Sequence, residues 1–308
     1  MFETIIRNGM ELKLHIDYHR DDSSLRKSMG SLCQATYGFD FEAAHRQLPP
    51  DERLHFYTLF HEHRAVSHIT VTEQDFRLGF RILQLAQLGT VMTREEYQGR
   101  GLIRLLMERV LRDFEGKDAL FLFANRAVSG FYPRFGFAPA AEYPRVVRPD
   151  VRNRLREQAG LSPAARKLDL DCSTFRRMLS LGRTGGSCHF YPINNQFLTG
   201  FYLKAFPHFS TAGMLWEIPG WNATAIAERD GERLIIHDLL ADRYCPLKVW
   251  LPPLITRDVR EVELRLALNH PWLQQVREED PDNRLFLRGP AADLLAGANI
   301  IFPTTAHT

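Results

Sequence analysis

A glycine-rich turn, Gln98-Gly99-Arg100-Gly101, constrains this chain more than any other feature, because it joins a strand-like run to an amphipathic helix. Residues 82–93 are mostly apolar or small, and residues 103–114 place apolar side chains on one helical face. Glycines let backbone N–H groups approach a ligand, and the unpaired N–H groups of a first helical turn favour phosphate. The segment therefore predicts strand, phosphate-binding turn and helix, although a Gly-x-Gly before a helix is also common as a plain tight turn.

Two better-known phosphate motifs do not fit this turn. A dinucleotide-binding turn requires a third glycine and a strand near the N-terminus, and both are missing here. A P-loop that ends in Gly-Lys-Ser or Gly-Lys-Thr is also absent from the sequence. The turn must therefore belong to another class of fold.

The elements around the turn predict a mixed α/β fold. A strand is expected over residues 11–18, a helix between Asp22 and Gly38, and a hairpin whose strands are 54–61 and 65–72. After the turn and its helix come an apolar strand, 119–124, and a short helix that ends at Gly136. This order implies a crossover connection between parallel strands.

Length and composition predict two domains without an extended charged arm. The 308 residues are 44% hydrophobic with a formal net charge of +2, which suits two cores of roughly 150 residues and gives no argument for nucleic acid or a membrane as partner. A basic linker is expected at 148–167, between a domain at 1–150 and another at 165–308. Four scattered cysteines and an N-terminus without an apolar run predict a reduced, cytoplasmic protein. The oligomeric state stays open.

Together with the later segment 121–137, which contains Asn125 and the run Phe131-Tyr132-Pro133-Arg134-Phe135-Gly136-Phe137, the turn resembles the GNAT acyltransferase superfamily. The pattern of that superfamily is Gln/Arg-x-x-Gly-x-Gly/Ala at the turn and an Asn followed by Phe-Tyr-x-x-x-Gly-Phe about thirty residues later. Ile103 departs from it, since Gly or Ala is usual at that position. The resemblance covers roughly residues 65–147 and implies a GNAT-like fold.

The resemblance also implies a chemistry, with acetyl-CoA as co-substrate and an amine as acceptor. Tyr132 would be the catalytic acid that protonates the departing thiolate. A backbone N–H near Val91 would polarise the thioester carbonyl. The residues implied in cofactor binding are Val91, Met92, Arg94, Gln98, Gly99, Arg100, Gly101, Leu102 and Asn125. Asn125 is equally well read as a helix N-cap, and an acyl-CoA sensor without transferase activity is the alternative function.

The general base is left open by the sequence. The candidates by position are His68, Glu73, Asp75, Glu95 and Glu96, with the carboxylate of Thr308 as a further option. His61 and His63 would share one strand face, but no third metal ligand is evident, so no metal site is predicted.

A second, degenerate GNAT-like lobe is expected in the C-terminal half. A hairpin over 223–228 and 234–240, an apolar run at 247–255 and a strand at 259–268 repeat the order seen in the first half, and a further strand is expected at 284–288. The equivalent of the glycine turn, residues 242–246, has no glycine and contains a proline, which predicts one acetyl-CoA site per chain. The second lobe is expected to form one wall of the acceptor site. Trp216, Trp221 and Trp250 are expected either to line this site or to pack in the core.

Overall fold

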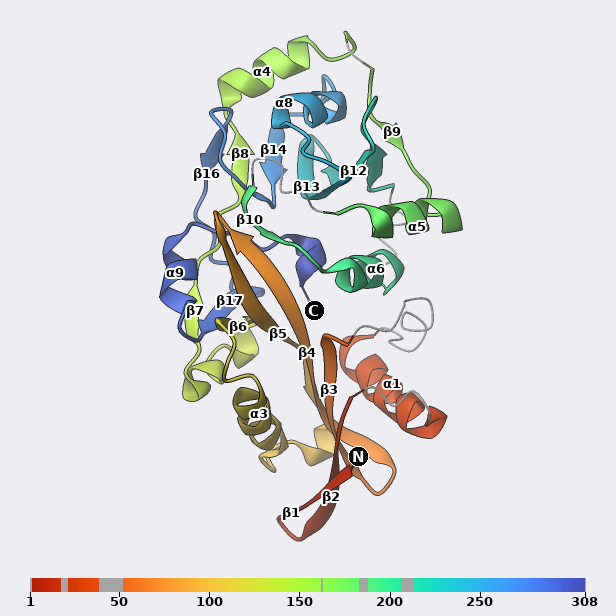
Figure 1. Ribbon diagram of the computed structural model, residues 1–308, viewed down its shortest axis with the longest axis vertical. Helices are drawn as coiled ribbons and strands as arrows, with labels where there is room; N and C mark the ends of the chain where they lie inside the picture. Colours follow the sequence, from red (N-terminus) through yellow and green to blue (C-terminus); the bar gives the residue numbers. More distant parts are fainter. Residues whose placement is uncertain are drawn as a thin grey trace.

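The computed structural model describes residues 2–17, 22–38, 52–161, 163–182, 188–205 and 213–307, and it holds two sheets arranged one above the other in Figure 1. Side by side, the main strands of the first sheet are β1 (Phe2–Arg7), β2 (Met10–Ile16), β3 (Leu54–His61), β4 (Arg64–Leu78), β5 (Arg81–Thr93), β6 (Ala119–Ala124), β17 (Arg284–Arg288) and β7 (Ala138–Ala140). Beside β4 lies β10 (Cys188–Pro192), which also pairs with β15 (Ala267–Leu268).

Two helices cover opposite faces of the first sheet. On one face, α1 (Ser23–Tyr37) packs its buried residues against Phe56 and Phe60 of β3. On the other, α3 (Leu102–Asp113) packs against β3 and β4 through a separate apolar cluster. The ends of α1 follow local chemistry, because the Asp22 side chain accepts two backbone N–H groups and Gly38 adopts a φ of 75°. The predicted helix is confirmed.

The predicted hairpin and crossover are confirmed as well. β3 and β4 are antiparallel around the turn after His61, and β4 continues into a long second hairpin with β5. The chain then crosses through α3 to β6, which runs parallel to β5. The first predicted strand is β2, which ends at Ile16; Tyr18 lies outside the described residues, and β1 was not predicted.

The second sheet repeats one feature of the first, an antiparallel hairpin followed by a crossover to a parallel strand. Its neighbours are β16 (Leu273–Gln275), β8 (Arg145–Val147), β14 (Glu261–Leu264), β13 (Arg233–Ala241), β12 (Ala223–Asp230), β11 (Leu215–Glu217) and β9 (Arg166–Lys167). β12 and β13 form the predicted hairpin, and the short helical segments α8 (Leu247–Trp250) and η4 (Pro252–Leu254) cross to β14, which is parallel to β13. No helix among the described residues is long and apolar enough to cross a membrane.

Two sequence expectations about the C-terminal half need correction. The segment 148–167 is not a plain linker, since Pro149–Glu157 forms helix α4, which buries Val151 and Leu155 against the second sheet. The expected strand at 259–268 is two strands, because the chain leaves β14 after Leu264 and joins the other sheet as β15.

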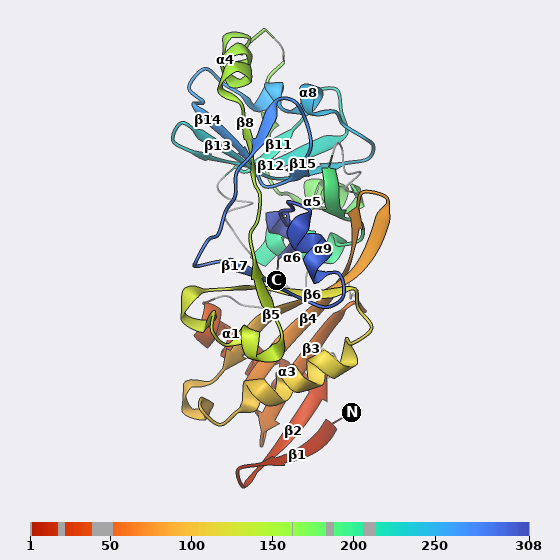
Figure 2. The ribbon, with the colours of Figure 1, turned by 90° about the vertical axis from the view of Figure 1, so that its left-hand side faces the viewer.

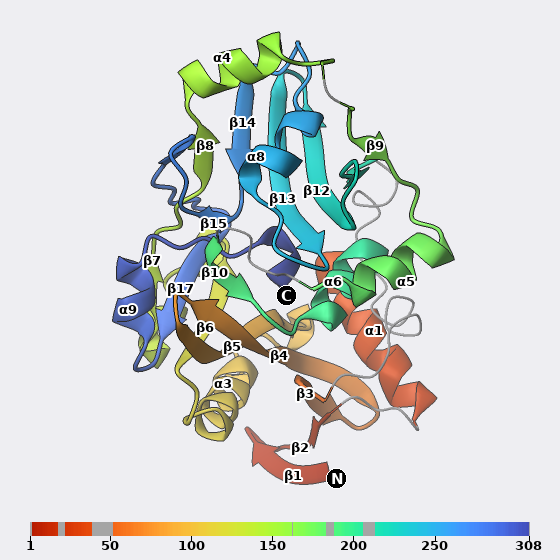
Figure 3. The same cartoon turned by 45° about the horizontal axis from the view of Figure 1, so that its top comes forward.

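The two lobes exchange segments. β17 follows the second lobe in sequence but inserts between β6 and β7 of the first sheet, while β8, which directly follows β7, belongs to the second sheet. Helices α5 (Cys172–Ser180), α6 (Gln196–Ala205) and α9 (Ala292–Gly297) lie near the junction, as Figures 2 and 3 show. The C-terminal turn η5 (Thr304–Ala306) packs between α6 and β13. The chain therefore ends between the lobes.

Candidate functional site

The site begins where two parallel strands separate. β5 and β6 pair only from Leu85–Ala119 to Gln87–Phe121, yet β5 continues to Thr93 and β6 to Ala124. The pairing of β4 with β5 shifts register opposite this point, and Thr90 has a φ of 42°, which is uncommon for a residue with a side chain. Unpaired strand edges expose backbone N–H and C=O groups to a ligand.

A cleft of about 850 Å³ occupies the opening. Its lining comes from α1, the end of β5, the glycine turn, α3, the end of β6, the segment after β6 and the loop before β17. The residues are Thr36, Tyr37, Val91, Met92, Thr93, Tyr97, Gln98, Gly99, Gly101, Leu102, Ile103, Arg104, Phe123, Ala124, Asn125, Val128, Phe131, Tyr132, Asp282 and Asn283. The structure thus brings both sequence motifs to one cavity of ligand size.

The glycine turn forms one wall. Gly99 and Gly101 have φ values of 74° and 76°, a region in which a side chain is strained. Gly101 is the N-cap residue of α3 and supplies no side-chain cap, so the first N–H groups of the helix have no capping side chain. Gly101 and the first two helical residues, Leu102 and Ile103, line the cleft. Arg7 of β1 also lies here, since a Cβ on Gly101 would stand 3.1 Å from its Nη2.

The arginines of the turn are arranged differently from one another. Arg104 lines the cleft, whereas Arg94 and Arg100 do not. Arg94 Nε donates to the Ala65 carbonyl at 2.7 Å, and Arg100 Nη2 donates to the Glu96 carbonyl at 3.0 Å. The cations near the helix entrance are therefore Arg104 and Arg7, neither of which belongs to the sequence motif.

Two tyrosines meet at the opposite wall. Tyr132 is 5% exposed, and its burial raises the pKa of the phenol to about 12, so it stays protonated at neutral pH. Tyr37 comes from the end of α1, and its hydroxyl donates to the Val91 carbonyl at 3.0 Å. Desolvation by burial is the main cause, and the nearby Tyr132 a smaller one, that raises the pKa of the Tyr37 phenol above its usual range. Sequence reasoning missed Tyr37, which lies in no motif.

Comparison with known proteins identifies the domain. Residues 31–140 match the family model described as the acetyltransferase (GNAT) domain. The match covers 110 of the 308 residues and identifies this part of the chain as a GNAT acetyltransferase domain. No curated protein matches the chain.

Solved GNAT structures share the fold across both sheets. A GCN5-related N-acetyltransferase from Kribbella flavida is 17% identical with a TM-score of 0.53, covering 91% of this chain and 72% of that one. Eis1 from Mycobacterium abscessus is 16% identical with a TM-score of 0.53, covering 92% and 75%. A probable N-acyltransferase from Enterococcus faecalis V583 is 12% identical with a TM-score of 0.52, covering 90% and 72%. At these identities the likeness shows the fold.

The predicted base candidates lie outside the cleft lining of the GNAT domain. His68 sits between Thr58 and Thr70, with both ring nitrogens 2.8 Å from a hydroxyl. Glu73 pairs with His55 and Lys117, and Asp75 accepts from Asn194. Glu96 pairs with Arg64 on the surface, and Glu95 is exposed. Thr308 lies outside the described residues.

Among the residues that line the cleft, the carboxylate is Asp282, from the loop before β17. The sequence does not predict Asp282 as a candidate base, because its segment falls within the expected second domain, 165–308. Asn125 lines the cleft at the N-cap position of the 3-10 turn η2 (Arg126–Val128), and its side chain makes no capping hydrogen bond. His61, one of the two histidines considered for metal, shares a hydrogen bond with the Tyr97 hydroxyl at 2.9 Å.

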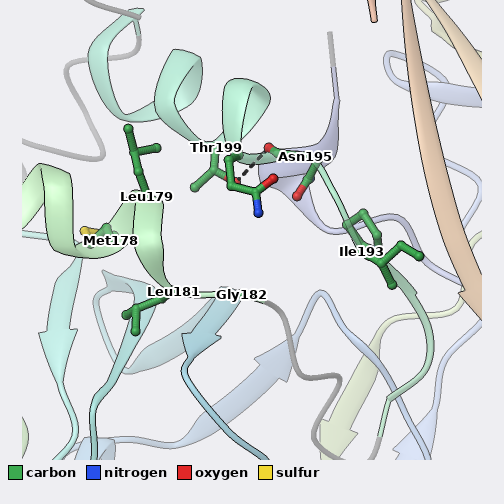
Figure 4. Close-up of a pocket in the computed structure, with 9 residues that line it drawn as sticks. Met178, Leu179, Leu181, Gly182, Ile193, Asn195 and Thr199 are labelled. Carbon is green, nitrogen blue, oxygen red and sulfur yellow. Dashed lines mark hydrogen bonds between the residues drawn. The ribbon is translucent and has the colours of Figure 1, made fainter. Parts of the chain in front are cut away.

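A second cavity, in the C-terminal half, is too small for a substrate. It lies beside α5 and α6, where Thr199 Oγ1 donates to the Asn195 carbonyl at 3.2 Å (Figure 4). Its volume of about 10 Å³ corresponds to about one water molecule. Trp250, Trp216 and Trp221 pack in or against the second-lobe core, which favours the structural role for these three side chains.

Proposed function

We propose that the protein is a cytoplasmic, acetyl-CoA-dependent N-acetyltransferase that passes the acetyl group directly to an amine. The observation that carries the proposal is that a single cleft joins the separated ends of β5 and β6, the glycine turn and Tyr132. Each of these three parts has a separate task in acyl transfer from a thioester that carries a pyrophosphate.

The residues of the cleft fit the parts of acetyl-CoA. The pyrophosphate would lie against the N–H groups from Gln98 to Leu102, with Arg104 at the same end. A Cβ on Gly99 would meet nothing within 4 Å, so there is room beside the turn. The pantetheine arm would run between the unpaired edge of β5 at Val91 and Met92 and the side chain of Asn125.

The transfer then needs an oxyanion donor and an acid. The neutral amine attacks the thioester carbonyl carbon, and a backbone N–H near Val91 stabilises the oxyanion that forms. As the C–S bond breaks, Tyr132 donates its proton to the sulfur, and the proton released by the amine restores the phenol. The products are an N-acetyl amide and free coenzyme A. Burial suits Tyr132 to this role because it keeps the phenol protonated until sulfur departs.

The acceptor would enter from the junction of the lobes. α6 shares an apolar cluster with β3 there, and Ala306 of η5 shares another with β4 and β6. Phe123, which lines the cleft, stacks on His307 with ring centroids 3.9 Å apart. We assign the acetyl-CoA domain to residues 1–150 and the C-terminal domain to 165–308, with β17 returning from the second to the first.

A Tyr132→Phe variant tests the assignment of the acid. We expect kcat to fall about a hundredfold or more while the Kd for acetyl-CoA stays within about twofold, since a general acid contributes typically that much. Tyr244→Phe, on the exposed surface of the second lobe, is the matched control. Unchanged turnover in Tyr132→Phe would remove the acid role. Binding of acetyl-CoA without turnover of any amine by the wild type would favour a sensor.

A further inference from the structure

The proposed transfer needs a second proton acceptor. An alkylamine reaches the protein as an ammonium ion at neutral pH, whereas only the neutral amine can attack a carbonyl carbon. The proton that the nitrogen releases after the attack restores the Tyr132 phenol. The proton that leaves the ammonium before the attack therefore needs another acceptor.

The cleft lining offers few groups that can accept this proton. The titratable side chains among its described residues are Tyr37, Tyr97, Tyr132, Arg104 and Asp282. Phenols are protonated at neutral pH, and burial raises the pKa of Tyr37 and Tyr132 further. The guanidinium of Arg104 has no acceptor atom, whereas a carboxylate in contact with water is ionised at neutral pH and only accepts. Asp282 is therefore the acceptor that the lining provides.

The chain holds Asp282 at the rim of the cleft. Asp282 belongs to the turn before β17, where its N–H donates to Asp280 Oδ1 at 2.9 Å and the Asn283 N–H donates to the Asp280 carbonyl at 3.4 Å. Asp282 is exposed, and its side chain has no hydrogen bond or ion pair with any residue that the structure describes. The neighbouring Arg284 pairs instead with Glu279 at 3.4 Å. The Asp282 carboxylate is thus available to a molecule in the cleft.

Strand register places Asp282 on the other side of the cleft opening from Val91. β6 is antiparallel to β17 with its last pair at Ala124 and Arg284, so the turn before β17 begins beside Asn125. By residue count along the parallel strands β5 and β6, Asn125 is level with Val91. A thioester held between Val91 and Asn125 therefore has Asp282 on its β17 side.

The strand that follows this turn also supports the acid. The Phe286 ring of β17 packs against Tyr132 with ring centroids 5.8 Å apart. The connection that carries Asp282 comes from β16 of the second sheet and runs to β17 of the first, as Figure 2 shows. The returning chain thus brings a carboxylate to a cleft whose other lining residues include none.

We propose that Asp282 is the catalytic base, whose carboxylate takes one proton from the ammonium group of the acceptor as its nitrogen enters the cleft. The N–H bond breaks, its electron pair stays on nitrogen, and an O–H bond forms on Asp282. The neutral amine then attacks the thioester carbon, and the exposed carboxylic acid returns its proton to water. The proposal rests on the proposed function, because it adds a residue to the same reaction.

Two small amines of similar shape test this role. Ethylamine is an ammonium ion at neutral pH, whereas trifluoroethylamine is mostly uncharged because its fluorines withdraw electrons. Coenzyme A release is measured with each amine at saturating acetyl-CoA, for the wild type and for Asp282→Asn. We expect Asp282→Asn to lower kcat for ethylamine by about a hundredfold, the lower end of what general bases contribute, and to change kcat for trifluoroethylamine by less than about threefold.

Two further variants serve as controls. Asp282→Glu keeps a carboxylate in the turn and should retain more ethylamine turnover than Asp282→Asn. Asp293→Asn removes an exposed carboxylate of α9 that does not line the cleft, and it should behave as the wild type.

Three results for Asp282→Asn would overturn the base role. Unchanged kcat and KM for ethylamine would make water the proton acceptor. A raised KM for ethylamine with unchanged kcat would mean that Asp282 only attracts the cation. An equal loss of kcat with both amines would trace the effect to the shape of the cleft.

Failure of the proposed function gives a different result, because it appears in the wild type. If the wild type does not bind acetyl-CoA in a calorimetric titration, or binds it and acetylates neither amine, the proposed transfer and the base role both fall. If the wild type acetylates trifluoroethylamine but not ethylamine, transfer stands and the base role alone is overturned.

Discussion

Replacing Gly101 by glutamate is the sharpest test of where the pyrophosphate binds. Gly101 begins α3, lines the cleft and has a φ of 76°. The substitution introduces a side chain in a strained backbone region and a negative charge at the helix entrance. Gly231, in the hairpin between β12 and β13, has a φ of 57° and open space around its Cβ position. Gly231→Glu therefore introduces a similar backbone strain far from the cleft, without the 3.1 Å contact that a Cβ on Gly101 makes with Arg7 Nη2.

The two effects have separable magnitudes. A side chain in the left-handed region costs about 1–2 kcal/mol, which both variants should lose in stability. A carboxylate about 4 Å from one phosphate charge adds a repulsion between about 1 kcal/mol in water and about 4 kcal/mol near a protein surface. Only Gly101→Glu carries this second cost, which weakens acetyl-CoA binding by between about fivefold and several hundredfold.

The assay is calorimetric titration of acetyl-CoA into wild type and both variants, with thermal unfolding as the measure of strain. We expect similar decreases of Tm in the two variants but a raised Kd only in Gly101→Glu. The reasoning is refuted if folded Gly101→Glu binds acetyl-CoA as tightly as the wild type. Equal weakening in Gly231→Glu would instead trace the effect to backbone strain.

Two further predictions concern the walls of the cleft and the C-terminal segment. Tyr37→Phe removes the hydrogen bond to the Val91 carbonyl, so we expect a loss of about 1 kcal/mol in urea unfolding and a KM for acetyl-CoA that rises more than kcat falls. Burial raises the pKa of Glu142, which accepts the Phe302 N–H at 2.9 Å, to about 8. Its contribution to stability is therefore fully present below its ordinary pKa of 4.5 and is lost as pH rises through about 8. Glu142→Gln should flatten this dependence in urea unfolding at a series of pH values, and an unchanged profile would contradict it.

The sequence predicted best the features that depend on neighbouring residues. Asp22 and Gly38 mark the ends of α1 because a capping carboxylate and a left-handed glycine act within one helical turn. The hairpin at Asp230-Gly231 and the strand at 119–124 follow equally local patterns of turn residues and apolar runs. The fold of the first half could therefore be predicted closely.

Long-range pairing and side-chain direction could not be predicted in the same way. β17 was predicted as a strand, but nothing in its sequence shows that it inserts beside β6. Arg94 and Arg100 match the position of the motif, yet both turn to backbone carbonyls instead of the cleft. Tyr37 and Asp282 reach the cleft from segments that lie far from the motif in sequence. Each of these outcomes depends on packing between distant segments.

The position of the second lobe within the chain connects the core of the first sheet to lobe packing. Because β17 returns to the first sheet, the residues after it are carried to the junction, where Thr305 donates to Asp238 of the second sheet and Ala306 accepts from Gln74 of the first. Gln74 Nε2 also donates to Gln87 Oε1 at 3.1 Å. The packing of the C-terminal segment between the lobes thus fixes the orientation of the buried Gln74 and Gln87 side chains, whereas no described residue of that segment lines the cleft. The cleft of the proposed transfer therefore belongs to the first lobe, and the chain that leaves the second lobe completes the sheet beside it.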